Sequence, residues 1–212
     1  MGKVAVVDYG MGNLRSVWQA LVHVADGREI VVTADPDEVR AAERVVFPGQ
    51  GAMPDCMREL EARGLRQAVL DAARSKPFLG ICIGLQMLFE HSDEGDVDGL
   101  GVFAGQVRRF PAERMLGANG ERLKVPHMGW NEVAQARNHP LWQGIADGAR
   151  FYFVHSYCVE PVERPVIAGI TDYGVAFTSA VARDNIFAIQ CHPEKSAQAG
   201  LALLSNFIRW KP

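Results

Sequence analysis

Cysteine is scarce in this 212-residue sequence: four cysteines are scattered along it, and no two form a Cys-x-x-Cys pair. This spacing argues against a disulfide framework or a structural zinc site and favours a reducing cytosol. Runs of lysine and arginine are also absent and the formal net charge is only −3, so nothing favours a nucleic-acid partner. The first apolar run, residues 4–7, is too short for a signal peptide or a membrane span. We therefore expect a cytoplasmic protein without metal or membrane contact.

What is present is the composition of an ordinary globular protein, 48% hydrophobic and 22% charged. One domain over residues 1–212 is the default, since the sequence shows no repeat or linker. Short apolar strands at 4–8, 29–33, 44–47 and 78–81 alternate with helical spacing at 14–24, 57–63, 65–74 and 85–90. This order predicts an α/β fold with an open, mainly parallel central sheet flanked by helices.

The second half of the sequence has a different pattern of predicted elements. Strand-like pieces at 102–110, 123–125, 131–133, 151–157 and 165–170 are separated by turns rather than by long helices. Two more, at 175–182 and 185–190, flank a predicted hairpin turn, and helical spacing returns at 198–210. We expect these pieces to add antiparallel strands to the sheet.

The most informative stretch is Gly80-Ile81-Cys82-Ile83-Gly84. An apolar run, a cysteine between two glycines and a helix-compatible run together describe a strand-to-helix elbow, related to the Gly-x-Ser-x-Gly elbow of hydrolases. The glycines permit a strained turn that presents Cys82, and a helix N-terminus favours the nucleophilic thiolate. Taken alone, the stretch fits an inert buried cysteine equally well.

A second signal is His192-Pro193-Glu194, which follows an apolar strand. Beside an elbow thiol, His192 would act as general base and then as general acid toward a leaving amine. Glu194 would orient the imidazole and stabilise its cationic form. The alternative is a solvated loop histidine in a surface pair with the glutamate.

A third signal is the loop Pro48-Gly49-Gln50-Gly51, again at the end of a predicted strand. Two glycines allow backbone N–H groups to converge on one point, as an oxyanion hole requires. Any turn could look like this by itself. In parallel α/β sheets, however, sites form at the carboxyl ends of the strands, and all three motifs fall at such ends.

Together, the three motifs resemble those of the class I (triad) glutamine amidotransferases, in the family's order and spacing. Segments 8–14, 126–131 and 152–157 are similar to the glutaminase subunits of imidazole glycerol phosphate synthases, so the resemblance covers nearly the whole chain. It implies a flavodoxin-like class I glutaminase fold and hydrolysis of glutamine to glutamate and ammonia, without a cofactor. The implied triad is Cys82, His192 and Glu194, with an oxyanion hole at Gly49, Gly51 and Ile83 and substrate contacts at Gln86, Ser156 and Tyr157.

The same resemblance implies a partner. Ammonia would pass into a (β/α)8-barrel cyclase subunit, in a heterodimer that makes imidazole glycerol phosphate and an aminoimidazole carboxamide ribonucleotide in histidine biosynthesis. Asn13, Met128, Trp130 and Asn131 would face that cyclase. Without the resemblance, Met128 and Trp130 would be assigned to the core and Asn13 to a helix cap.

Two residues depart from the family's pattern: Gln50 stands where valine is common, and Cys158 where a second tyrosine is common. Both bear on loop geometry and substrate contacts rather than on the triad. Other functions stay open, among them a stand-alone thiol hydrolase such as a γ-glutamyl peptide hydrolase and a catalytically idle regulatory subunit. A vitamin B6 or purine synthase partner is the alternative for the ammonia acceptor.

Overall fold

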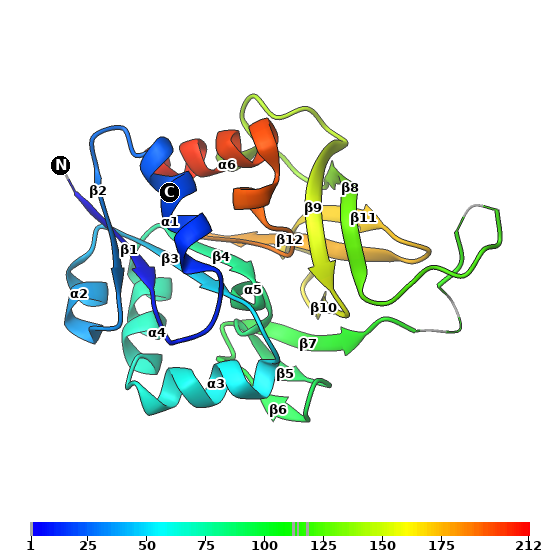
Figure 1. Ribbon diagram of the computed structural model, residues 1–212, viewed down its shortest axis with the longest axis horizontal. Coiled ribbons are helices and arrows are strands. Elements are labelled where there is room, and N and C mark those ends of the chain that lie inside the picture. Colours follow the sequence, from blue (N-terminus) through cyan, green and yellow to red (C-terminus); the bar gives the residue numbers. More distant parts are fainter. Residues whose placement is uncertain (1, 112, 114, 118) are drawn as a thin grey trace.

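The computed structural model of the chain describes residues 2–111, 113, 115–117 and 119–212. Within these residues, a thirteen-stranded sheet runs through the molecule in the order β2-β1-β3-β4-β13-β12-β10-β7-β5-β6, with β11 joined to β12 and the β8–β9 pair joined to β11. Figure 1 shows α1 and α6 above the sheet and α3 and α4 below it. The strands are β1 (Lys3–Val7), β2 (Glu29–Thr33), β3 (Arg44–Gly49), β4 (Phe78–Cys82), β5 (Phe89–Ser92), β6 (Val97–Asp98), β7 (Phe103–Arg109), β8 (His127–Gln135), β9 (Ala149–His155), β10 (Tyr157–Pro161), β11 (Ile167–Asp172), β12 (Ala176–Arg183) and β13 (Ile186–Ile189).

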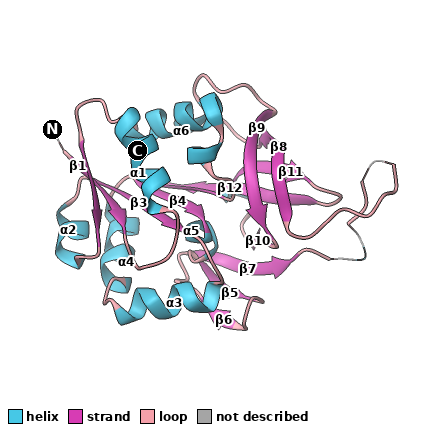
Figure 2. Cartoon of the chain, viewed as in Figure 1, coloured by secondary structure: helices cyan, strands magenta, loops and turns pink. Residues whose placement is uncertain are grey.

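The helices are mostly short and fill the connections between strands. The α-helices are α1 (Leu14–His23), α2 (Pro36–Ala41), α3 (Met53–Ala62), α4 (Arg66–Ser75), α5 (Ile83–Gln86) and α6 (Ala197–Arg209). In the part of the chain that the structure describes, single turns of 3-10 helix are η2 (Pro140–Trp142), η3 (Arg164–Val166) and η4 (Pro193–Lys195). Figure 2 shows that helices gather around the first half of the sheet, whereas strands dominate around β7 to β12. No described helix is long and apolar enough to cross a membrane.

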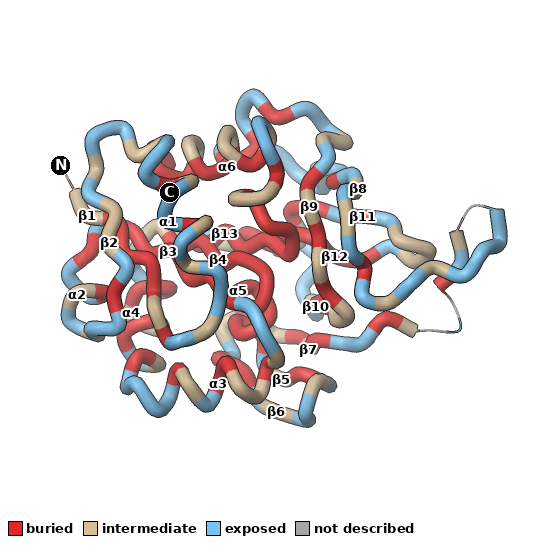
Figure 3. Tube along the Cα trace, in the orientation of Figure 1, coloured by how far each residue is buried: buried red, intermediate tan, exposed pale blue. Residues whose placement is uncertain are grey.

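The parallel part of the sheet holds the core. Strands β2, β1, β3, β4 and β13 are all parallel, and β12 runs antiparallel to β13. Every residue of β3, β4 and β13 is buried, because helices cover both faces, and this is why these strands read as unbroken apolar runs. Figure 3 shows the burial concentrated along these strands. The predicted α/β fold with a mainly parallel sheet and added antiparallel strands is confirmed.

Two local predictions were wrong, and one helix was missed. The helix expected at 85–90 ends at Gln86, and β5 begins at Phe89. The carbonyl of Leu88 instead accepts from the N–H groups of Val102 and Phe103, so tertiary pairing ends the helix. Residues 123–125 form no strand, and α2, which begins with an Asp35 side-chain cap, was not predicted.

Candidate active site

Cys82 is the last residue of β4, and its backbone is strained. Its φ of 56° lies in the left-handed region, which residues with a side chain rarely adopt outside functional sites. Two glycines hold the turn in place by close packing: a Cβ on Gly84 would lie 1.9 Å from the Phe47 carbonyl oxygen, and one on Gly80 would lie 2.9 Å from Ala188 Cβ. The elbow thus rests directly on its two neighbouring strands, with no room for a larger residue.

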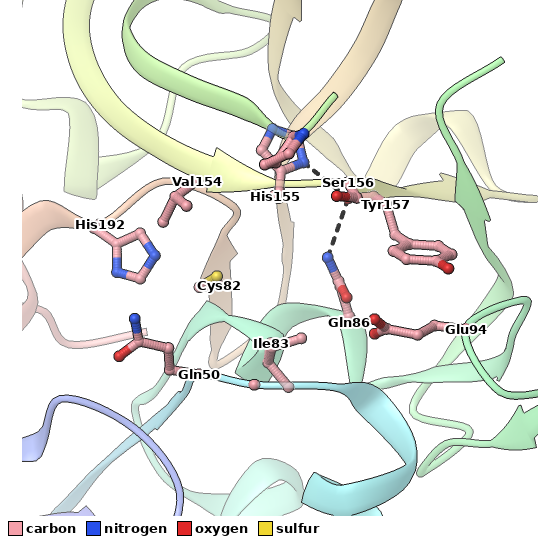
Figure 4. Close-up of a pocket in the computed structure, with 12 residues that line it drawn as sticks. Gln50, Cys82, Ile83, Gln86, Glu94, Val154, His155, Ser156, Tyr157 and His192 are labelled. Carbon is pink, nitrogen blue, oxygen red and sulfur yellow. Dashed lines mark hydrogen bonds between the residues drawn. The ribbon is translucent and has the colours of Figure 1, made fainter. Parts of the chain in front are cut away.

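His192 reaches Cys82 from the adjacent strand. Because Ile189 of β13 pairs with Ile81 of β4, the chain beyond Ile189 runs beside the elbow. His192 Nδ1 lies 2.9 Å from Glu194 Oε1, and the two side chains are only 5% and 1% exposed. Figure 4 shows the imidazole turned toward Cys82. The structure therefore brings the three predicted catalytic residues together, and the alternative of a solvated loop histidine is wrong.

The electrostatics of His192 suit a base that holds a proton beside a thiolate. Burial lowers the pKa of His192, but the charge of a Cys82 thiolate, hydrogen bonding to that sulfur and the Glu194 carboxylate together raise it to about 10. Glu194 occupies Nδ1, and apart from the Cys82 sulfur the buried Nε2 has no hydrogen-bond partner among the described residues. The free nitrogen is therefore the one available to exchange a proton with Cys82.

The glycine loop after β3 lies on the other side of the elbow. Gly49 is paired with Cys82 across the sheet, and Gly51 has a φ of +122° that favours glycine. Gly51 and Ile83 line the same cavity as Cys82, whereas Gly49 is buried against the Tyr9 hydroxyl and does not line it. Of the three residues predicted for the oxyanion hole, two therefore face the cavity.

The cavity above Cys82 has a volume of about 240 Å³. It gathers the predicted Gln86, Ser156 and Tyr157 and adds residues that the motifs did not indicate. Glu94 is the most significant of these, because it brings a carboxylate to the end of the cavity that holds Gln86 and Tyr157 (Figure 4). Its position in a turn after β5 gives no sequence signal. The full lining is Gln50, Gly51, Cys82, Ile83, Gln86, Glu94, Pro126, Val154, His155, Ser156, Tyr157 and His192.

Two buried glutamines lie between the cavity and the sheet. Gln86 Nε2 donates to the Tyr157 carbonyl at 3.1 Å and to Gln190 Oε1 at 3.0 Å. Gln190 Nε2 in turn donates to Cys82 Sγ at 3.7 Å. No sequence motif indicates Gln190, because its position beside Cys82 depends on the register of β13 with β4.

A chain of hydrogen bonds connects this cluster to the surface of β8. Asn131 Nδ2 lies 3.3 Å from His127 Nε2, His127 Nδ1 lies 3.0 Å from His155 Nε2, and His155 Nδ1 lies 2.8 Å from the Tyr157 carbonyl. Burial lowers the pKa of His127 to about 4 and that of His155 to about 3, so both rings are neutral near pH 7. Since a carbonyl only accepts, His155 Nδ1 carries the proton, and every donor in the chain points from Asn131 toward the cavity.

The residues predicted to face a partner lie in two places. Met128, Trp130 and Asn131 line one hollow on β8, where the Met128 and Trp130 side chains are 62% and 44% exposed. The alternative that placed these two in the core is therefore wrong. Asn13 lies apart from them at the start of α1, where its side chain caps the helix by accepting from the Ser16 N–H.

No group of three or more histidine, cysteine, aspartate or glutamate side chains in the described part of the chain is placed to hold a metal ion. The reactive groups in the site are the thiol, the imidazole, the carboxylates and the backbone N–H groups. This set suits nucleophilic attack on a carbonyl carbon, with one group that can both remove and return a proton.

Comparisons with known proteins agree with this chemistry. The family model for class-I glutamine amidotransferases matches residues 5–210. Imidazole glycerol phosphate synthase subunit HisH of Dechloromonas aromatica is 71% identical over 209 residues, which cover 99% of this chain and 97% of that protein. The subunit of the same name from Aromatoleum aromaticum is 66% identical over 212 residues, the full length of both.

Solved structures share the fold at much lower identity. PurLQS from Thermotoga maritima matches with a TM-score of 0.73 at 18% identity, over 99% of each chain. A structure described as a glutamine amidotransferase matches with a TM-score of 0.69 at 16% identity, over 93% of this chain and 94% of that one. The chain is therefore an enzyme of the class I glutamine amidotransferase family, and it falls among the glutaminase subunits of imidazole glycerol phosphate synthase.

Proposed function

We propose that Cys82, His192 and Glu194 form the triad that hydrolyses glutamine. The observation that carries this proposal is the strained elbow thiol beside a buried His192–Glu194 pair of 2.9 Å. The Cys82 thiolate attacks the carboxamide carbon, and the C–N bond breaks as His192 gives its proton to the departing ammonia. The resulting thioester is then attacked by water, whose proton His192 takes, and glutamate leaves as Cys82 is restored.

The cavity offers a complementary group for each end of the substrate. Gln86 Oε1 is buried and has no partner among the described residues, so it can accept a substrate N–H. The Glu94 carboxylate suits the α-ammonium group, and the Ser156–Tyr157 segment completes the amino-acid end of the cavity. The N–H groups of Gly51 and Ile83, with Gly49 supporting the loop, are our candidates for stabilising the oxyanion.

The partner in this proposal is a (β/α)8-barrel cyclase, which the relatives' name as a synthase subunit supports. The two subunits form a cytoplasmic heterodimer in which ammonia passes to the cyclase and drives its lyase reaction in histidine biosynthesis. Met128, Trp130 and Asn131, with Asn13 nearer the glycine loop, form the docking face. The loop of Asn13 reaches the site directly, because Met11 packs over Gly51 and Gly12 lies against the Gln50 N–H.

Glutamate release from purified protein, with and without the cyclase and its nucleotide ligand, tests the proposal. We expect low activity for the isolated chain and a rise of about two orders of magnitude on docking, the effect of one correctly aimed oxyanion donor. Cys82→Ala should abolish the reaction and leave docking intact. Cys158→Ala is the matched control and should stay active: although Cys158 departs from the family's pattern, that buried thiol lies in β10 and does not line the cavity. A fully active isolated chain would instead favour the stand-alone hydrolase, and activity in Cys82→Ala would exclude the triad.

A further inference from the structure

We infer that Gln190 is a positioning residue for the nucleophile: its side-chain N–H group donates a hydrogen bond to the sulfur of Cys82 and favours the thiolate. The inference rests on the proposed role of Cys82 and assigns a function to a residue outside the triad. It follows from the orientation of two buried amides, from the burial of Gln190 and from the register of two strands.

The orientation of the Gln190 amide follows from its neighbours. The Tyr157 carbonyl can only accept, so the nitrogen of the Gln86 amide must face it. The same nitrogen reaches the Gln190 amide at 3.0 Å, and that contact must therefore be to the Gln190 oxygen. The Gln190 nitrogen is left facing Cys82 Sγ at 3.7 Å, so the amide presents a donor to the sulfur rather than a second acceptor.

Because it is buried, this contact has a larger effect on the energy of the sulfur. Gln190 is 0% exposed, and a buried N–H group without an acceptor is costly. A thiolate accepts a hydrogen bond more strongly than a neutral thiol does, so a fixed donor favours the charged sulfur. The donor complements His192, which exchanges the proton, because the amide stabilises the thiolate without titrating.

The strand register holds Gln190 where this role requires it. Ile189 pairs with Ile81, which places the next residue of each strand, Gln190 and Cys82, side by side. The Gln190 backbone N–H donates to the Ser179 carbonyl at 2.8 Å on the other side. Gln190 does not line the cavity, so its contribution reaches the substrate only through the sulfur.

The pH dependence of Cys82 alkylation by iodoacetamide, followed by peptide mapping, tests the inference without relying on turnover. Gln190→Met keeps the length of the side chain and removes the donor. We expect the midpoint of the alkylation profile to rise by roughly one pH unit, the size expected for a hydrogen bond to a charged group. Gln190→Glu places a carboxylate beside the sulfur and should raise the midpoint further. Ile189→Met, on the preceding buried residue, is the matched control and should leave it unchanged.

Steady-state kinetics with the cyclase present give a second readout. In Gln190→Met we expect kcat near neutral pH to fall by up to about tenfold, because the sulfur loses the donor that favours its charged form, and KM to stay within about twofold. Circular dichroism tests whether each variant is folded. If Gln190→Met does not fold, Gln190→Glu, which keeps the shape of the side chain, takes its place in the test. An unchanged midpoint in the folded variants overturns the inference. Preferential labelling of another cysteine in the unaltered chain would instead overturn the proposed role of Cys82.

Discussion

At the scale of single residues, the four cysteines differ by environment rather than by type. Burial raises the pKa of Cys56 to about 11 and that of Cys158 to about 12, and it raises the pKa of Cys191 well above its ordinary value. None of these three has a histidine of raised pKa as its partner. Cys82 does, and it also lines a cavity. Reactivity in this chain is therefore set by what surrounds each sulfur.

The raised pKa of His192 predicts a pH dependence of stability. The folded chain holds the His192 proton up to about pH 10, against 6.5 for an unperturbed histidine. A proton held more tightly in the folded state contributes stability that is full below pH 6.5 and is lost as the pH rises through about 10. We expect Glu194→Gln to lower the pKa of His192 and to flatten this loss.

Urea unfolding at a series of pH values between 6 and 10.5 provides the measurement. His192→Asn, which removes the titrating group, defines the slope that the rest of the chain contributes. If the unaltered chain and His192→Asn show parallel curves across this range, folding does not raise the pKa of His192.

At the scale of elements, the elbow depends on the absence of side chains at its two glycines. A methyl group at Gly84 would lie 1.9 Å from the Phe47 carbonyl oxygen, so Gly84→Ala must push α5 away from β3. We expect the free energy of unfolding to fall by about 1–3 kcal/mol, the usual cost of overpacking. We also expect a large loss of kcat, because Cys82 moves with the helix.

Gly64→Ala separates lost stability from lost activity. Gly64 follows α3 with a φ of +66° and has no atom within 4 Å of an added Cβ, so alanine there strains the backbone without a clash. Chemical unfolding should show a stability loss of about 1 kcal/mol, while glutamate release stays unchanged. Equal kcat values in both variants would show that the packing of Gly84 does not position the nucleophile.

The same elements show which parts of the fold can be predicted from the sequence. Residues 29–33 were predicted as a strand and form β2 over the same residues, since a short β-branched run between turn signals has few alternatives. The elbow helix was overestimated, because Leu88 and Phe89 suit a helix and a buried strand equally well by pattern. The motifs indicated Cys82, His192 and Glu194, which lie at or just after the ends of strands and which the fold brings together. Gln190 comes to lie beside Cys82 only through the pairing of β13 with β4. The Glu94 carboxylate is held by the Met53 N–H group at the start of α3, and no local pattern encodes either contact.

At the scale of the whole molecule, the surface on β8 and the surface on β2 lie far apart, so variants on the two can be compared. Trp130 lies on β8 with its side chain 44% exposed, in edge-to-face contact with Tyr152 at 6.2 Å. We expect Trp130→Ala to change the stability of the isolated chain little and to weaken cyclase binding by about 2 kcal/mol, as the loss of an aromatic anchor does. Val32→Ala is the control, because β2 is at the far end of the sheet (Figure 1).

Isothermal titration calorimetry with the cyclase measures the effect on binding, and thermal unfolding measures the effect on the chain itself. We expect Val32→Ala to bind as the unaltered chain does. Equal affinities for all three proteins would mean that the hollow on β8 is not where the cyclase docks.

The pairing of β4 with β13 has a consequence for how the enzyme forms. Cys82 and Gln190 are 108 residues apart in the chain, and they become neighbours only when strands from the two halves meet. Contacts between such distant segments form slowly, because closing a long loop costs conformational entropy before the contacts can offset it. Recovery of activity during refolding should therefore trail the recovery of helix signal. In the proposed site, His192 and Glu194 lie within the last 21 of the 212 residues, so a nascent chain would be unable to release ammonia until its end had been made and inserted beside the elbow.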